Sequence, residues 1–313
     1  MEYIKLRGTD VRISRIGFGC CPMGGYDWGE THEDDFIYAV HHALDKGINF
    51  FDTADIYGVG ASETVLGKSL RTHRNKAFVA TKFGVRRYPD GTTFYDNSPE
   101  WFASALEASL KRMGTDYIDL YQVHYWDKTT SPEIIFDLLE KARQEGKVRF
   151  FGVTNIDLMF WALKNWPDAL VSFSFEYSLA KRIHERAISH LSQKQGLAFL
   201  SWGSLGQGIL SGKYDDKTEF PEGDRRRRAV YINFHGNKLK KNLEIVREMQ
   251  LLQLHYPDKT LSQIALRWIL DRFERSVTLV GIKRPDQLTE NIGALGWQLD
   301  QCDLQRLDMV SKD

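Results

Sequence analysis

Strand-like and helix-like segments alternate along most of this 313-residue chain, and this alternation is its most restrictive feature. Eight short runs are rich in apolar, β-branched and aromatic residues, as is typical of parallel strands covered on both faces. No linker rich in proline, glycine and serine interrupts the repeat. We therefore expect an α/β fold, one (β/α)8 TIM barrel that spans residues 1–313 as a single domain. The expected strands are Ile16–Gly19, Asn49–Asp52, Ala77–Lys82, Ile118–His124, Val148–Thr154, Leu170–Glu176, Leu197–Trp202 and Val277–Ile282.

Local signals mark the ends of several expected helices. In Ser98-Pro99-Glu100 and Ser131-Pro132-Glu133 the serine can cap a helix, and the proline suits its first turn. Apolar residues recur at helical spacing after both starts. Glycine follows several helical runs, at the position where a left-handed cap favours it. These glycines are Gly47, Gly114, Gly146 and Gly196.

Three segments depart from the repeat. Residues 2–15 alternate in polarity around Gly8-Thr9-Asp10 and are expected to form a β-hairpin that covers the bottom of the barrel. Residues 298–313 are expected to form an extra C-terminal helix. Residues 206–240 are expected to form a long irregular loop, which in a compact fold is usually functional or mobile. The run Arg225–Arg228 in this loop is either a clamp for an anionic group or an ordinary solvated stretch.

Composition disfavours several classes of protein. Lys+Arg and Asp+Glu both number 42, and a net charge of zero offers no whole-molecule attraction to nucleic acid or an anionic membrane. No run approaches the roughly 18 apolar residues of a membrane span, and the start lacks the apolar stretch of a signal peptide, so we expect a cytoplasmic protein. The three cysteines form no C-x-x-C pair and are expected to be reduced. The nine histidines show no metal-ligand spacing.

Four side chains suited to proton transfer follow successive strands. Asp52 and Tyr57 follow the second expected strand, Lys82 ends the third and His124 ends the fourth. The carboxyl ends of barrel strands gather at one mouth, so we expect these side chains to converge. A free tyrosine has a pKa near 10, and the ammonium of Lys82 is expected to lower the pKa of Tyr57. Each residue alone also has an ordinary structural explanation, but together they favour the reduction of a carbonyl group.

In that reaction each group has a distinct expected role. Tyr57 gives a proton to the developing alkoxide, while Asp52 holds Lys82 in place. His124 can hydrogen-bond the carbonyl oxygen and orient it toward the phenol. The chemistry needs a hydride donor as well, and a cofactor is the usual source.

This combination of residues resembles that of the aldo-keto reductase family, and the resemblance covers essentially the whole chain. It implies that Asp52, Tyr57, Lys82 and His124 form a catalytic tetrad in which Tyr57 is the acid. It also implies that Thr154 and Asn155 hold the carboxamide of a nicotinamide, and that Gln287, Glu290 and Asn291 hold the adenosine end. The matching segments are Gly17–Gly19, Asp52–Gly58, Thr81–Lys82, His124, Gly152–Asn155, Leu205–Tyr214 and Gln287–Asn291.

The cofactor side also has a physical basis. Trp202 ends the seventh expected strand, where its ring could stack on a nicotinamide, and the glycines of Leu205–Gly212 would let backbone amides approach a pyrophosphate. No G-x-G-x-x-G follows the first strand, so a Rossmann domain is not indicated. Lys283 and Arg284 suit a 2′-phosphate, which favours NADP(H) over NAD(H), with NAD(H) and a solvated charge pair left open. The expected cofactor-binding set is Gly19, Cys20, Asp52, Thr154, Asn155, Ser174, Trp202, Gly203, Leu205, Gln207, Gly208, Leu210, Gly212, Lys213, Gly281, Lys283, Arg284, Gln287, Glu290 and Asn291.

Two positions depart from the family pattern. Many relatives carry glutamine at the position of Ser174 and serine at that of Gly203, so amide contacts near the nicotinamide are expected to differ here. Bulky aromatic residues are expected to line the substrate mouth and to favour a flat or sugar-like molecule. These are Trp28, Tyr88, Tyr125 and Trp126.

The sequence therefore predicts an NADP(H)-dependent oxidoreductase that transfers hydride to or from a small aldehyde, ketone, sugar or alcohol. Tyr57 would serve as general acid in reduction and general base in oxidation. One alternative is a regulatory nucleotide-binding subunit like the potassium-channel β subunits of the same family. Another is a barrel lyase in which Lys82 forms a Schiff base.

Overall fold

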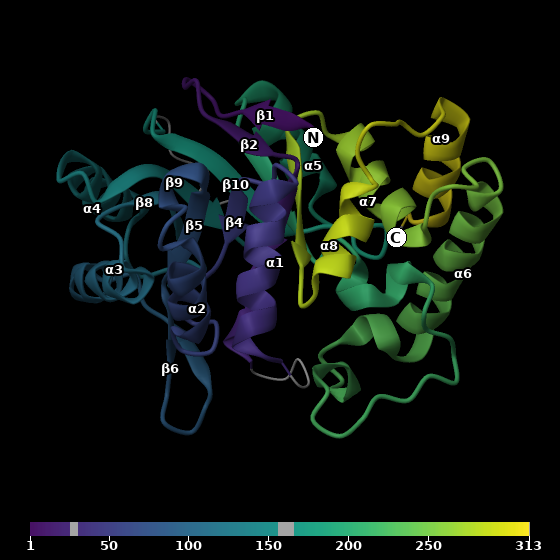
Figure 1. Ribbon diagram of the computed structural model, residues 1–313, viewed down its shortest axis with the longest axis horizontal. Helices are drawn as coiled ribbons and strands as arrows, with labels where there is room; N and C mark the ends of the chain where they lie inside the picture. Colours follow the sequence, from purple (N-terminus) through teal and green to yellow (C-terminus); the bar gives the residue numbers. More distant parts are fainter. Residues whose placement is uncertain (26–30, 156–165, 313) are drawn as a thin grey trace.

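The computed structural model describes residues 1–25, 31–155 and 166–312. Within these residues eight parallel strands close into a barrel with helices packed around it (Figure 1), which confirms the expected fold. Each expected strand is present with its ends shifted by no more than one residue. The barrel strands are β3 (Ile16–Gly19), β4 (Phe50–Asp52), β5 (Phe78–Phe83), β8 (Ile118–Val123), β9 (Val148–Thr154), β10 (Leu170–Glu176), β11 (Ala198–Trp202) and β12 (Ser276–Gly281).

The helices begin and end where local chemistry indicates. The Ser98 and Ser131 side chains accept hydrogen bonds from the backbone of Trp101 and Ile134, at 3.3 and 3.4 Å, so both predicted serine caps are confirmed. The described helices are α1 (Glu33–Asp45), α2 (Ala61–Leu70), α3 (Pro99–Met113), α4 (Pro132–Gln144), α5 (Glu185–Ser189), α6 (Gly236–Gln253), α7 (Leu261–Arg272), α8 (Pro285–Ile292) and α9 (Gln301–Val310).

The predicted N-terminal hairpin closes the bottom of the barrel. Strand β1 (Tyr3–Lys5) pairs antiparallel with β2 (Arg12–Ser14), and Ile4, Leu6 and Ile13 turn into the barrel interior. There they pack against alternate residues of the barrel strands, because successive side chains of a strand point to opposite faces. The interior set is Phe50, Phe78, Ala80, Leu120, Val171, Ala198, Leu200, Val277 and Leu279. Because these side chains fill the bottom of the barrel, a binding site is expected at its carboxyl end.

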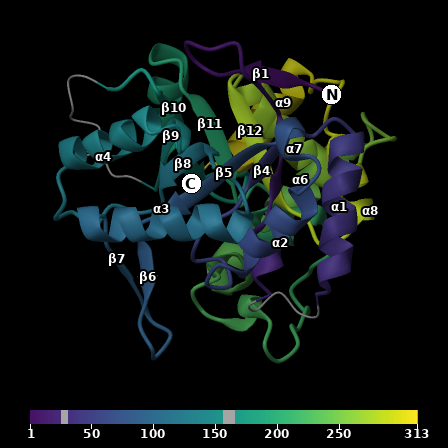
Figure 2. The same ribbon diagram turned by 60° about the vertical axis from the view of Figure 1, so that its left-hand side comes forward.

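Two further elements stand at that carboxyl end. A hairpin of β6 (Val85–Arg87) and β7 (Thr93–Tyr95) follows β5, and it was not predicted because each strand has only three residues. The predicted loop 206–240 contains three short 3₁₀ turns, and its boundary was wrong because α6 already begins at Gly236. Figures 1 and 2 both place the β6–β7 hairpin and this loop on the side opposite to the β1–β2 hairpin.

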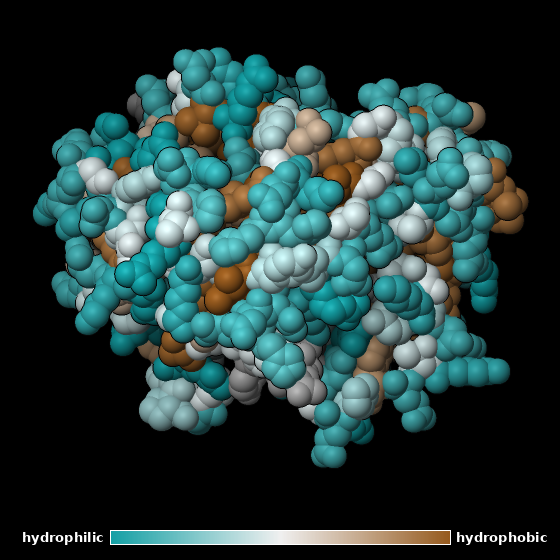
Figure 3. Space-filling model, in the orientation of Figure 1, coloured by the Kyte–Doolittle hydropathy of each residue, from teal (hydrophilic) through white to brown (hydrophobic). Residues whose placement is uncertain are grey.

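The visible surface is mainly hydrophilic, with small apolar areas scattered between polar ones (Figure 3). Among the described residues no helix combines the length and apolar character needed to cross a membrane. None of Cys20, Cys21 and Cys302 takes part in a disulfide bond.

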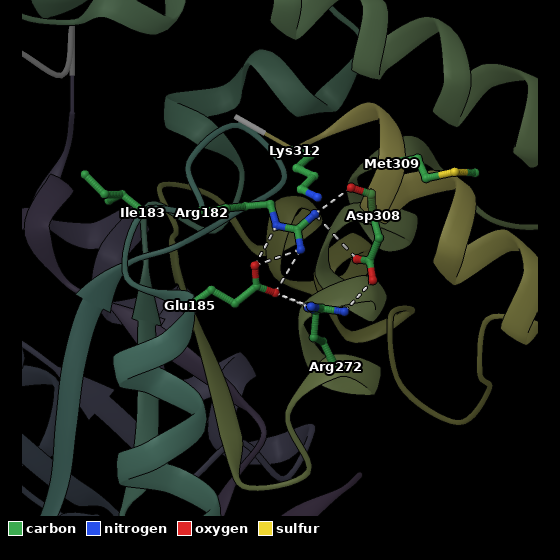
Figure 4. Close-up of a pocket in the computed structure, with 7 residues that line it drawn as sticks. All are labelled: Arg182, Ile183, Glu185, Arg272, Asp308, Met309 and Lys312. Atoms are coloured by element: carbon green, nitrogen blue, oxygen red, sulfur yellow. Dashed lines mark hydrogen bonds and ion pairs between the residues drawn. The ribbon is translucent and has the colours of Figure 1, made fainter.

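Helix α9, expected as a C-terminal addition, is tied to the barrel by a closed set of ion pairs (Figure 4). Arg182 pairs with Glu185 at 2.8 Å, and Arg272 pairs with both Glu185 and Asp308 of α9. These groups line a recess of about 500 Å³ together with Ile183, Met309 and Lys312. Each of the two carboxylates, Glu185 and Asp308, faces both guanidinium groups. The network therefore joins separate chain segments, and it leaves little uncompensated charge to bind a ligand.

Candidate active site at the carboxyl end of the barrel

A buried ion pair lies at the centre of the mouth. The Nζ of Lys82 donates to Asp52 Oδ1 at 2.6 Å and to the Thr53 carbonyl at 2.7 Å. Both charged side chains are about 95% buried, with 5% and 6% of their surface exposed. Gln122, on the neighbouring strand β8, donates to the second oxygen of Asp52 at 3.2 Å. Both carboxylate oxygens are therefore held, and the position of the ammonium is fixed by barrel strands.

Tyr57 and His124 complete the set that the sequence predicted. The Lys82 ammonium lies 5.1 Å from the centre of the Tyr57 ring, and the Tyr57 and His124 rings meet edge to face at 5.9 Å. His124 follows β8 directly, and its Nδ1 is buried without a hydrogen-bond partner among the described residues. Four groups from three strand ends thus converge as expected.

Burial controls the acidity of both rings. It raises the pKa of Tyr57 well above the usual 10, with further contributions from Cys21 and Asp52. The expectation that Lys82 lowers this pKa is wrong for this structure, because the ammonium is already paired with Asp52 and desolvation of the phenol dominates. Burial, followed by the charge of Lys82, lowers the pKa of His124 well below 6.5. Its imidazole is therefore neutral at pH 7, and Tyr57 holds its proton firmly.

Close backbone contact places Tyr57 at the mouth. Gly58, with φ +62°, packs against Gly24 of the turn Cys21–Gly24, and a Cβ on Gly24 would lie 2.7 Å from the Gly58 nitrogen. Two adjoining glycines are needed because any side chain would force these segments apart. The same contact brings Cys21 close enough to affect the pKa of Tyr57.

A polar cluster joins His124 to the next strands. Thr154 donates its hydroxyl to the His124 carbonyl, and Asn155 donates to the same oxygen at 3.4 Å. Asn155 has φ +52°, a conformation that asparagine tolerates better than most residues. Its side-chain oxygen accepts the Trp202 indole N–H at 3.1 Å, and its backbone N–H donates to the Ser174 carbonyl at 3.0 Å. The predicted nicotinamide-side residues Thr154, Asn155, Ser174 and Trp202 therefore form one cluster.

The predicted phosphate-side segment is a tight turn beside that cluster. Gln207 and Gly208 both have positive φ, +56° and +103°, within the 3₁₀ turn Gly206–Ser211. The backbone N–H groups of Gly208 and Leu210 both donate to the Leu205 carbonyl, at 2.9 and 3.2 Å. The remaining expected residues of the segment, Gly212 and Lys213, follow at its end, where Gly212 has φ +74°.

The first and last barrel strands bring the other expected cofactor residues to the same mouth. Gly19 pairs with Asp52 and Gly281, and the Cys20 N–H donates to the Asp52 carbonyl at 2.8 Å. A Cβ on Gly19 would lie 2.9 Å from the Val280 carbonyl oxygen.

Helix α8 follows β12 closely and carries the outer expected residues. The backbone N–H of Lys283 donates to Gln287 at 2.9 Å, which fixes the first turn. Arg284 pairs with Asp286 at 3.0 Å in solvent. The Glu290 carbonyl accepts from Gln263, and Asn291 is buried.

One residue of the run Arg225–Arg228, Arg226, lies close to Lys283 in this outer region. Arg226 pairs with Asp224 at 2.6 Å, and its guanidinium lies 4.3 Å from the centre of the Phe220 ring. Burial and the nearby charge of Arg226 lower the pKa of Lys283, so the two cations are neighbours. Arg227 and Arg228 are exposed, which fits the interpretation of this run as a solvated stretch. Arg226 is half-buried and does not fit that interpretation.

Comparison with known proteins agrees with this geometry. The model of the Aldo/keto reductase family matches residues 15–312. The chain belongs to this family. It is 31% identical to aldo-keto reductase YhdN of Bacillus subtilis over 99% of this chain and 93% of that protein, and 31% identical to aldo-keto reductase yakc [NADP(+)] of Schizosaccharomyces pombe over 96% and 88%. The solved glycerol dehydrogenase AKR11B4 from Gluconobacter oxydans superposes with a TM-score of 0.89, at 31% identity over 98% and 94% of the two chains.

In this aldo/keto reductase, one carboxylate of the mouth was missed by sequence reasoning. Glu176 ends β10, pairs with Lys181 and accepts from the side chain of Gln207 at 2.8 Å. Gln207 in turn accepts from Asn233, so the turn at residue 207 is held from both sides. The sequence signal was available, because Glu176 is a charged residue at a strand's carboxyl end.

The predicted substrate-side residues of this aldo/keto reductase lie in different environments. Tyr125 stacks on His124 at 5.2 Å, next to the candidate site. Trp126 donates to the Thr130 carbonyl at 2.7 Å within its own loop, and Tyr88 stacks on Phe94 of the hairpin at 4.2 Å. Trp28 lies outside the described residues.

Proposed function

We propose that this member of the aldo/keto reductase family transfers hydride between NADP(H) and the carbonyl or alcohol carbon of a small molecule. The observation that supports this most directly is the convergence of Tyr57 and His124 beside the buried Lys82–Asp52 pair. No other group of described residues combines a phenol, an imidazole and an ion pair at the mouth of the barrel in this way.

The residues of the mouth fit a dinucleotide. The cluster of Thr154, Asn155 and Trp202 offers hydrogen-bonding groups and an indole for a nicotinamide with its carboxamide. The turn around Gly208 carries no side chain at that position, and Arg226 and Lys283 supply neighbouring cations for phosphate. The name of the Schizosaccharomyces pombe relative, which includes NADP(+), supports the same choice.

The bound nicotinamide would supply hydride to the substrate carbon or accept it. In reduction, the Tyr57 hydroxyl donates its proton to the developing alkoxide oxygen. Neutral His124 donates a hydrogen bond to the same oxygen and orients it toward the phenol. Alcohol oxidation uses the same groups in reverse, with Tyr57 as the proton acceptor.

The high pKa of Tyr57 has a direct consequence for this mechanism. A firmly held proton keeps the phenol at neutral pH in its donor form, which is the form that reduction requires. Oxidation needs the phenolate and is expected to accelerate as the pH rises.

The lyase alternative is disfavoured by the same geometry. A Schiff base needs a free amine, yet Lys82 is buried and donates to two acceptors at 2.6 and 2.7 Å. The regulatory-subunit alternative would be supported by NADPH binding without turnover on any carbonyl compound.

The Tyr57→Phe variant tests the proposal. It keeps the ring contact with His124 but removes the proton, so NADPH binding measured by fluorescence should stay unchanged while reduction falls by about two orders of magnitude or more. Near-normal turnover in this variant would remove the proposed role of Tyr57.

A further inference from the structure

A recess lies at the bottom of the barrel, between the turn of the β1–β2 hairpin and the starts of strands β11 and β12. Its volume is about 470 Å³, and residues 5–10 of the hairpin line it together with Gly196 and Arg275. Gly196 comes two residues before β11, and Arg275 directly precedes β12. Figure 1 shows this hairpin on the side opposite to the β6–β7 hairpin, so the recess and the candidate active site lie at opposite ends of the barrel.

Cations predominate among the described residues that line the recess. Lys5, Arg7 and Arg275 are present against a single carboxylate, that of Asp10. Asp10 pairs with Lys5 at 2.7 Å, but the Asp10 side chain is fully exposed and that of Lys5 is 53% exposed, so solvent screens this pair. At neutral pH three positive charges therefore face one negative charge.

Both guanidinium groups are held in place, yet most of their donors are unused. Arg7 donates to the carbonyls of Gln195 and Pro167, at 3.3 and 3.2 Å. Arg275 donates to the Lys5 carbonyl at 2.8 Å. A guanidinium carries five N–H donors, so within the described residues Arg7 uses two of them and Arg275 uses one. The Nε of Arg275 is buried and has no hydrogen-bond partner among these residues, a costly state that an anionic acceptor beside Arg275 would relieve.

The wall of the recess leaves room for more than a single small ion. Gly8 and Gly196 contribute backbone without side chains, and a Cβ on Gly196 would lie 3.7 Å from Cδ of Arg7. The volume of about 470 Å³ falls within the usual range of small-molecule pockets, about 300–1,000 Å³. A side chain at Gly196 would occupy part of this space next to Arg7.

We propose that this recess binds a phosphate group, at a site separate from the candidate active site. Arg7 and Arg275 contact the phosphate oxygens, since a guanidinium matches phosphate geometry with paired N–H donors. Lys5 adds charge at the rim. A neutral ligand would leave these cations uncompensated, and a metal cation would be repelled. The phosphate comes either from solution or on a small phosphorylated molecule, and this inference does not depend on the proposed function.

Titration calorimetry with inorganic phosphate and with glucose 6-phosphate, at constant ionic strength, tests the proposal. The protein is saturated with NADP+, so that phosphate does not enter the proposed cofactor site. Arg275→Gln and Arg7→Gln should each weaken the binding of both probes about tenfold or more, as expected for a lost hydrogen bond to a charged group. Tighter binding of glucose 6-phosphate identifies a phosphorylated molecule as the ligand, whereas equal binding identifies the phosphate group alone.

Exposed residues of the same hairpin provide matched controls. Arg12→Gln removes an exposed cation of β2 that is not among the residues lining the recess, so the affinity should stay unchanged. Lys5→Gln should weaken binding about two- to fivefold, and Asp10→Asn should tighten it by a similar factor, because each removes one exposed charge. General damage to the hairpin would not tighten the binding of an anion.

Four results would overturn the inference. The first is the absence of binding to the unchanged protein at millimolar concentrations of both probes. The second is an equal loss in Arg275→Gln and Arg12→Gln, which would indicate attraction to surface charge in general. The third is loss of phosphate binding in Lys283→Ala, which would assign the phosphate to the proposed cofactor site. The fourth is the absence of opposite shifts in Lys5→Gln and Asp10→Asn, which decides the question even where Arg7→Gln and Arg275→Gln fail to fold.

Discussion

Glu176 occupies the space that a side chain at position 203 would need. A Cβ on Gly203 would lie 3.0 Å from Cγ of Glu176 and 3.4 Å from its Oε1, and Gly203 has φ +64°. Glu176 is held in that place by Lys181 and by Gln207. Gly203 therefore accompanies a carboxylate that fixes the neighbouring turn.

This relationship predicts that Gly203→Ser is destabilising. A positive φ costs a non-glycine residue about 1–2 kcal/mol, and displacement of Glu176 adds to it. We expect the free energy of unfolding in urea to fall by at least about 1 kcal/mol. In a Glu176→Ala background the steric part should disappear, so the same substitution should cost less. An equal cost in both backgrounds would assign the whole effect to backbone strain.

Removal of the Lys283 charge should weaken the binding of NADPH more than the binding of NADH. Lys283 is half-buried near Arg226, where a 2′-phosphate would be partly shielded from water. A hydrogen bond to a charged group contributes about 1.5–3 kcal/mol, so Lys283→Ala should weaken NADPH binding by roughly 10- to 150-fold and NADH binding much less. Arg284→Ala, which removes an exposed residue paired with Asp286, should have a smaller effect. Equal losses for NADPH and NADH in Lys283→Ala would contradict a 2′-phosphate contact.

Asp55 should make stability depend on pH in the neutral range. Burial, followed by the charge of Glu63, raises the pKa of Asp55 from 3.8 to about 8, while Arg112 and Lys82 oppose the shift. Its Oδ1 has no hydrogen-bond partner among the described residues. For this raised pKa, the stability that protonated Asp55 confers is complete below about pH 4 and is lost as the pH rises through 8.

The variant Asp55→Asn carries no charge at any pH. Relative to the unchanged protein, its free energy of unfolding should therefore improve by roughly 1.4 kcal/mol per pH unit between about pH 5 and pH 7. Urea denaturation at the two pH values measures this difference. Asp216→Asn, at an exposed site, is the matched control and should show no such trend. A difference that stays constant for Asp55→Asn would show that Asp55 is ionised in the folded protein.

Loss of Arg272 should loosen the attachment of α9. Its guanidinium bridges Glu185 and Asp308, and its side chain is 27% exposed. Arg272→Met leaves two partly buried carboxylates with less compensation, so we expect a loss of about 1–3 kcal/mol in unfolding free energy with turnover retained. Lys68→Met breaks the exposed pair with Glu33 at 2.8 Å and should cost measurably less. Similar losses in both variants would mean that the network adds nothing beyond a surface ion pair.

Much of the site was predictable because its parts are local. Lys82 ends one apolar run and His124 ends the next, so strand periodicity and the geometry of a parallel barrel suffice to bring them together. Gln122 and Glu176 were within reach of the same reasoning. The recess beside Arg275 was not, since Arg275 and Lys5 lie 270 residues apart in the chain and no local pattern brings them together.

By itself, the sequence determined the eight-stranded barrel, the hairpin that closes its bottom and the four groups that meet at the mouth of the barrel. These features depend on apolar periodicity and on the order of the strands, which are both local properties of the sequence. Only the tertiary structure decided the acidity of Tyr57, whose pKa rises where Lys82 led us to expect a fall. It also decided why position 203 is glycine and which cations line the recess at the bottom of the barrel. Desolvation and close packing depend on distances between segments far apart in the chain, and no local pattern encodes those distances.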